Sequence, residues 1–94
     1  MNKITWIFRD GFKTIECTSF PYAYRSMKYA FEDGIKEGRD KLDMFKKFAI
    51  ISPMKDAYGD KKVYTWYDAT EMAKAQGLVN AEGQINGKEF KRKY

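Results

Sequence analysis

The strongest constraint on the fold is the dipeptide Asp10–Gly11, which lies between two runs rich in β-forming residues, Lys3–Arg9 and Phe12–Thr18. Asp-Gly favours a two-residue hairpin turn because both residues tolerate the positive φ that this turn requires. Such a loop places Arg9 opposite Phe12 and collects large apolar side chains on one face. The chain should therefore begin with two antiparallel strands that share one buried face.

A helix is expected after this hairpin. Ser19 can cap its first turn, and Pro21 lies at an early position that tolerates proline. Large and small apolar side chains then recur at three- and four-residue spacing, which predicts one buried stripe: Phe20, Ala23, Tyr24, Met27, Ala30 and Phe31. Gly38 is the expected end of the helix. The segment 40–46 stays ambiguous and is compatible with a short helical turn.

The second half of the chain is expected to repeat this order. Residues 47–52 include a run that is apolar on both faces, which predicts a central strand ended by Pro53. Residues 62–67 form a second strand rich in β-formers. The segment 68–71 matches a capping box, so a second helix should begin there and end at Gly77.

The predicted fold class is thus α+β with a ββα-ββα order. Its sheet has four mostly antiparallel strands, and both helices lie on one face. We expect residues 1–79 to form one domain. Residues 80–94 should be a basic C-terminal extension, packed or partly mobile, for which helix, hairpin and disorder all stay open.

The positive charge is concentrated in that extension. The chain has a net charge of +5, and residues 88–94 hold four positive and one negative side chain, or +3. The remaining residues therefore carry only +2. A nearly neutral body argues against a broad nucleic-acid-binding face, because such faces usually collect many Lys and Arg side chains.

The chain lacks the residue types on which most catalytic and metal sites depend. It has no histidine and one cysteine, Cys17, which excludes Ser-His and Cys-His pairs and the usual Cys/His zinc sites. A lone cysteine and the lack of any apolar segment of ~20 residues fit a cytoplasmic protein without membrane contact. We expect a non-enzymatic protein with no catalytic residues, no metal and no cofactor.

The aromatic content is more informative. Two Trp, seven Tyr and seven Phe exceed what the predicted core would use. Tyr22 and Tyr29 lie off the apolar stripe of the first helix, beside Arg25. Because Tyr and Arg are enriched in protein-binding hot spots, we expect a small protein-binding module that docks an unidentified protein through Tyr22, Arg25 and Tyr29. A homo-oligomer stays open.

Nucleic acid is the alternative partner. Basic side chains can neutralise phosphates while neighbouring rings stack on bases. A strand that presents aromatic rings between lysines is also typical of single-stranded RNA platforms. The residues of this alternative are Lys88, Phe90, Lys91, Arg92 and Lys93 in the extension, and Lys62, Tyr64 and Trp66 in the second predicted strand.

One short stretch points to a known family. Residues 67–75 read Tyr-Asp-Ala-Thr-Glu-Met-Ala-Lys-Ala. They resemble the Asn-Ala-Thr-x-Met-Ala-Lys-Ala stretch of the KilA-N family, viral and phage domains associated with DNA binding. Asp68 stands where the family has Asn, and the tryptophan-containing helix that follows in the family has no counterpart. The resemblance implies a phage-type origin, as for a viral regulator or inhibitor, and contact with DNA.

Overall fold

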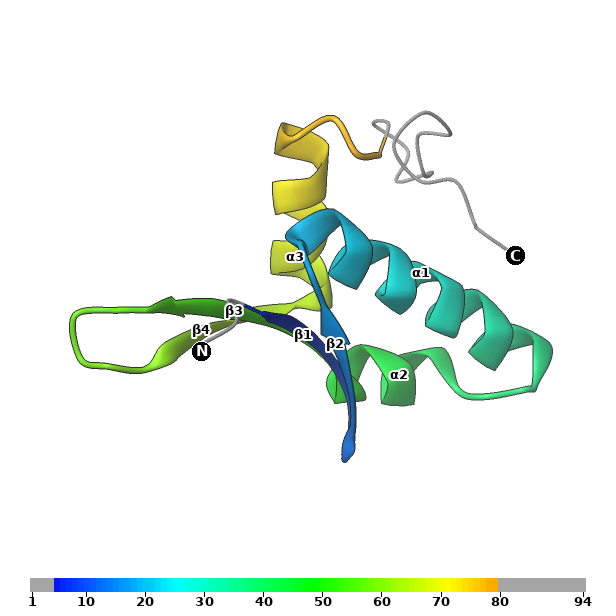
Figure 1. Ribbon diagram of the computed structural model, residues 1–94. Helices are drawn as coiled ribbons and strands as arrows, with labels where there is room; N and C mark the ends of the chain where they lie inside the picture. Colours follow the sequence, from blue (N-terminus) through cyan, green and yellow to red (C-terminus); the bar gives the residue numbers. More distant parts are fainter. Residues whose placement is uncertain (1–4, 80–94) are drawn as a thin grey trace.

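The computed structural model describes residues 5–79, which form an open four-stranded antiparallel sheet and three helices (Figure 1). The elements are β1 (Trp6–Asp10), β2 (Lys13–Cys17), α1 (Phe20–Lys36), α2 (Lys41–Lys47), β3 (Phe48–Lys55), β4 (Lys61–Thr65) and α3 (Trp66–Ala75). The strand order is β2-β1-β3-β4. The α+β class is confirmed. The element order is ββααββα rather than ββα-ββα, because the ambiguous segment after α1 forms the additional helix α2.

The predicted N-terminal hairpin is present, but its register differs by two residues. Asp10 pairs with Lys13, so the loop consists of Gly11 and Phe12 rather than Asp10 and Gly11. Gly11 has φ +63°, which a type II′ turn requires at the first loop position. Asp10 keeps its place in β1, where its carboxylate accepts hydrogen bonds from Arg39. A shift of two residues leaves the two faces of the hairpin unchanged.

Helix α1 begins where the sequence predicts. The Ser19 hydroxyl accepts a hydrogen bond from the N–H of Tyr22, and Pro21 lies in the first turn. The helix ends at Lys36, and Gly38 follows with φ +84°. These signals are local, which is why sequence alone locates this helix.

The predicted end of the central strand, at Pro53, is wrong. β3 does not stop at Pro53 but continues to Lys55. Its pairing with β4 shifts register between Ile51 and Lys55. A proline is tolerated at such an irregularity because its missing N–H removes no regular ladder hydrogen bond.

The predicted boundary between the last strand and the last helix is also wrong. β4 ends at Thr65, so Trp66 and Tyr67 begin α3 instead of closing the strand. The N-cap residue is Thr65 rather than Asp68, because the Thr65 hydroxyl accepts the N–H of Asp68 at 3.3 Å. This three-residue difference makes Trp66 a helix residue, and its ring packs against Phe31, Phe45 and Phe48.

The hydrophobic core lies where α1 packs against β1, β2 and β3, and where α3 packs against β3, β4 and α1. The largest fully buried side chains come from strands and helices alike: Tyr24, Phe48, Met27, Met44 and Ile50. The Tyr24 hydroxyl also lies 3.2 Å from that of Thr70, which ties α1 to α3 by a hydrogen bond. In the part of the chain that is described, no helix has the length and apolarity needed to cross a membrane.

Candidate functional site

The residues predicted to bind protein lie on α1. Tyr22 is exposed, and the guanidinium carbon of Arg25 lies 4.9 Å from the centroid of its ring. This distance is that of a cation–π pair. Tyr29 follows Tyr22 by two helical turns and is partly buried. The structure therefore brings Tyr22 and Arg25 together and places Tyr29 further along the same side of the helix.

Of the strand residues predicted to bind nucleic acid, the structure brings Lys62 and Tyr64 together. The Lys62 ammonium lies 5.0 Å from the Tyr64 ring centroid. The Tyr64 ring is partly buried, with centroid distances of 6.2 Å to Trp6 and 6.4 Å to Phe20. Trp66 belongs to α3. The other predicted nucleic-acid residues all belong to the C-terminal extension and lie outside the described residues: Lys88, Phe90, Lys91, Arg92 and Lys93.

A cluster of rings at the junction of the three helices was not predicted. Phe31 from α1, Phe45 from α2 and Trp66 from α3 have centroids 4.8 to 5.3 Å apart. The rings of Phe31 and Phe45 are stacked, and the Lys28 ammonium lies 5.4 Å from the Trp66 ring centroid. We call Phe31, Phe45, Trp66 and the adjoining Tyr67 the aromatic surface.

Part of the aromatic surface is open to solvent. Phe45 is 37% exposed and Tyr67 is 81% exposed. Together with Trp66, they form the aromatic wall of a pocket of about 180 Å³, whose other lining residues are Thr70, Glu71 and Lys74. Small-molecule sites usually measure ~300–1,000 Å³. The pocket is therefore better matched to one large side chain than to a metabolite.

Further exposed apolar side chains extend this region. Ile35 lies one turn after Phe31 on α1, and Leu42 lies one turn before Phe45 on α2. They are 41% and 66% exposed. Neither residue lines the pocket, and single exposed apolar residues are ordinary, but several on neighbouring helix turns enlarge the apolar area that a partner can cover.

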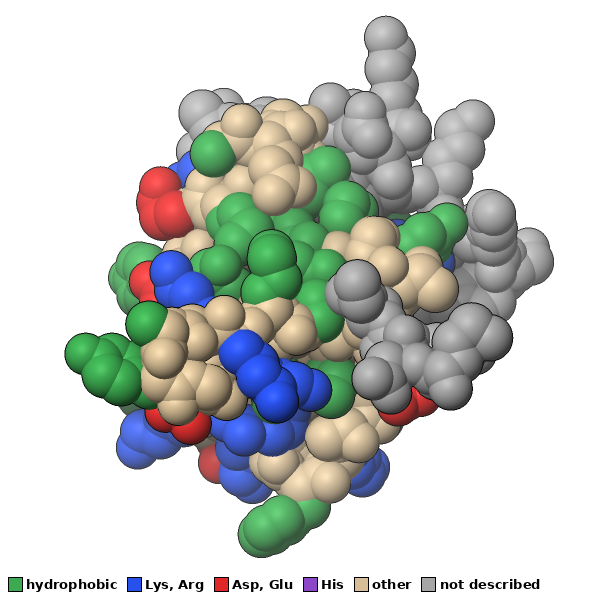
Figure 2. Space-filling model, turned by 60° about the vertical axis from the view of Figure 1, so that its left-hand side comes forward, with side chains coloured by type: hydrophobic (Ala, Val, Ile, Leu, Met, Phe, Trp, Pro, Cys, Tyr) green, Lys and Arg blue, Asp and Glu red, His purple; other side chains and the backbone are tan. Residues whose placement is uncertain are grey.

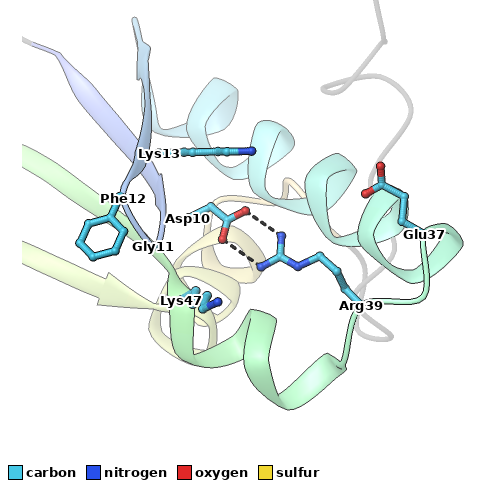
Figure 3. A pocket seen from close by; sticks show the side chains of 7 residues that line it. All are labelled: Asp10, Gly11, Phe12, Lys13, Glu37, Arg39 and Lys47. Atoms are coloured by element: carbon cyan, nitrogen blue, oxygen red, sulfur yellow. Dashed lines mark hydrogen bonds and ion pairs between the residues drawn. The ribbon is translucent and has the colours of Figure 1, made fainter.

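A larger pocket of about 500 Å³ lies between the β1–β2 hairpin and the segment around α2 (Figure 3). Arg39 donates two hydrogen bonds to the Asp10 carboxylate, at 2.8 and 3.1 Å, across this pocket. The Asp43 carboxylate lies 3.6 Å from Arg39 and 3.2 Å from Lys47. The Gly11 N–H also donates to the Lys47 carbonyl at 3.1 Å. The volume of this pocket lies within the range of small-molecule sites, but its Asp10, Arg39 and Lys47 side chains are engaged in these contacts. We therefore interpret the contacts as a clamp that holds the hairpin against α2.

This clamp should contribute to stability in a pH-dependent way. The Arg39 guanidinium holds the pKa of Asp10 below its usual value. A carboxylate with a lowered pKa stabilises the fold at neutral pH, and this contribution is lost as the pH falls through that lowered pKa. We expect Asp10→Asn to reduce the free energy of unfolding by about 1–2 kcal/mol at neutral pH.

Urea denaturation of the wild type and of Asp10→Asn, at neutral pH and near pH ~3, measures this effect. The cost of the substitution should be smaller in acid. The matched control is Asp60→Asn in the exposed β3–β4 loop, which should cost less than ~0.5 kcal/mol. A cost of Asp10→Asn that is the same at both pH values would contradict the clamp.

Comparison with known proteins identifies no relative. No family model, no curated protein and no solved structure matches the chain. The stretch that resembles the KilA-N family lies within α3, and no family match accompanies that resemblance. No group of three or more His, Cys, Asp or Glu side chains within residues 5–79 is arranged to hold a metal ion.

Proposed function

We propose that the chain is a small non-enzymatic protein-binding module whose main docking site is the aromatic surface. The observation that carries this proposal is the pocket of about 180 Å³ walled by Phe45, Trp66 and Tyr67. Binding hot spots are enriched in Trp and Tyr and are centred on well-packed pockets. The proposed occupant is a large apolar side chain presented by a partner protein.

Three rings of the aromatic surface, those of Phe31, Phe45 and Trp66, pack against one another before any partner binds. Trp66 contacts Phe31 and Phe45, and the ring of the buried Phe48 lies 6.3 Å from it. A preorganised site loses less conformational entropy on binding, so more of the contact energy contributes to affinity. Glu71 and Lys74, whose charged atoms lie 3.9 Å apart, would supply the polar rim that such interfaces have.

The predicted Tyr22–Arg25 pair supports a second contact region for the same partner. Arg25 and Lys28 are neighbours at i and i+3 on α1, and Lys28 lies against the Trp66 ring. A partner seated on the aromatic surface could therefore extend along α1 to Tyr22, Arg25 and Tyr29. This second region should contribute less to the binding free energy than the aromatic surface, because Tyr22 and Arg25 lie outside the pocket.

Affinity capture from a nuclease-treated lysate of cells that carry the protein tests this proposal. The bait is the full chain as wild type, Tyr67→Glu or the control Phe12→Glu, which changes another exposed ring in the β1–β2 loop. We expect the wild type and Phe12→Glu to capture the same protein. Its affinity for Tyr67→Glu should be at least ~10-fold lower than its affinity for the wild type. Equal capture by all three baits would exclude the aromatic surface as the docking site.

A further inference from the structure

The β3–β4 hairpin, which projects from the sheet in Figure 1, carries three exposed lysines near its end. Lys55 and Lys61 are direct cross-strand partners, so their side chains share one face. Lys62 is the next residue of β4, so its side chain lies on the opposite face, against the Tyr64 ring. The ion pairs found within residues 5–79 include none of these three lysines.

Like charges directly opposite each other destabilise a strand pair. Lysine in an edge strand can protect against aggregation, which accounts for Lys61 because β4 is at the edge of the sheet. Lys55 is also at the edge, because it lies beyond Phe48–Ile51, the part of β3 that pairs with β1. Two lysines directly opposite each other concentrate positive charge at this end of the hairpin.

The carboxylate of Asp56 and the backbone of Asp60 order the loop between β3 and β4. One carboxylate oxygen of Asp56 accepts the N–H groups of Tyr58 and Asp60, at 2.8 and 3.0 Å. The Asp56 N–H in turn donates to the Asp60 carbonyl at 2.8 Å. These bonds order the turn, and they leave the Tyr58 ring 90% exposed at its tip.

The view in Figure 2 brings this side of the molecule forward. Lys and Arg side chains gather in its lower half, with a few Asp and Glu side chains among them, below a band of hydrophobic side chains. Proteins that bind single strands without sequence preference combine such positive charges, which follow the phosphate backbone, with exposed rings on which bases stack. The end of the β3–β4 hairpin offers both groups within one ordered turn.

We propose that the end of the β3–β4 hairpin binds single-stranded nucleic acid. Lys55, Lys61 and Lys62 neutralise backbone phosphates, and Tyr58 stacks on a base. Of the strand residues predicted from sequence, only Lys62 belongs to this site. The inference is independent of the proposed protein-binding function, because the hairpin and the aromatic surface share no residue.

The test is the fluorescence anisotropy of a labelled oligo-dT with the full chain at low salt. We compare the wild type with a hairpin variant that combines Lys55→Gln, Lys61→Gln and Lys62→Gln. The matched control combines Lys36→Gln, Lys41→Gln and Lys46→Gln, three exposed lysines on α1 and α2 that are also absent from the described ion pairs. Both variants remove the same charge, and circular dichroism confirms that each is folded.

We expect the hairpin variant to bind at least ~10-fold more weakly than the wild type. The slope of log affinity against log salt concentration should become less steep by about 2, since each phosphate contact to a single strand contributes about 0.7. The control should change affinity less than ~3-fold. Tyr58→Ala should weaken binding ~5-fold or more, because stacking is worth about 1–3 kcal/mol per base.

Four results would overturn this inference. The wild type may fail to bind the oligonucleotide, or both triple variants may lose affinity equally. Deletion of residues 88–94 may abolish binding while the hairpin variant binds normally, which would assign the activity to the C-terminal extension. Polyglutamate may compete as well as unlabelled oligo-dT, which would show a general affinity for polyanions. None of these results bears on capture through the aromatic surface.

Discussion

Replacing Gly34 with alanine is expected to lower the free energy of unfolding by about 1–3 kcal/mol, even though alanine favours a helix more than glycine does. Gly34 is buried in α1, next to Met44 of α2. A Cβ added there would overlap the sulfur of Met44, which is itself fully buried, and would come within 3.4 Å of the Arg39 side chain. Urea denaturation measures the loss.

Gly34→Ala in a Met44→Ala background shows whether the loss of stability comes from the overlap with the Met44 sulfur. Without the Met44 sulfur, the alanine at position 34 should stabilise the protein by up to ~1 kcal/mol, because only the gain in helix propensity remains. An equal loss in both backgrounds would contradict the close approach of the two helices. That approach matters for the site, because α2 carries Phe45.

The second large effect is expected at Trp66. Trp66→Ala should cost about 2–3 kcal/mol, below the full cost of a buried aromatic because the ring is partly exposed. It removes contacts with Phe31, Phe45 and Phe48 at once. Thermal or urea unfolding measures the change, and Tyr67→Ala at the next position of α3 is the matched control.

Tyr67→Ala should cost less than ~0.5 kcal/mol, because its side chain is largely exposed. If Trp66→Ala and Tyr67→Ala lowered the free energy of unfolding by the same small amount, the packing of Trp66 would not stabilise the aromatic surface. The contrast also guides binding experiments. Variants at Tyr67 can report on docking alone, whereas variants at Trp66 combine docking with stability.

Sequence patterns located the elements whose signals are local. Ser19, Pro21 and Gly38 lie within or next to α1, so its bounds follow from neighbouring residues. Asp10–Gly11 and Gly11–Phe12 both suit two-residue turns, and in the second of these Asp10 stays in β1, where it binds Arg39 across the clamp. Turn propensity alone cannot include that contact, and it therefore assigned Asp10 to the loop.

The aromatic surface was missed for two reasons. Alternating β-formers before Trp66 favoured a strand through Tyr67, although Thr65 and Asp68 also have the spacing of a helix cap. That signal could have located the start of α3. The meeting of Phe31, Phe45 and Trp66 could not be predicted, because it depends on how three helices pack and not on any local spacing.

The most direct test of the aromatic surface is an NMR titration of the ¹⁵N-labelled protein with the partner that the wild type captures. We predict the largest shift changes at the amides of Phe45 and Tyr67 and at the Trp66 indole N–H, with smaller changes near Tyr22. The β3–β4 hairpin should not respond. Changes confined to residues outside α1, α2 and α3, with the Trp66 indole unaffected at saturation, would contradict the proposed docking site.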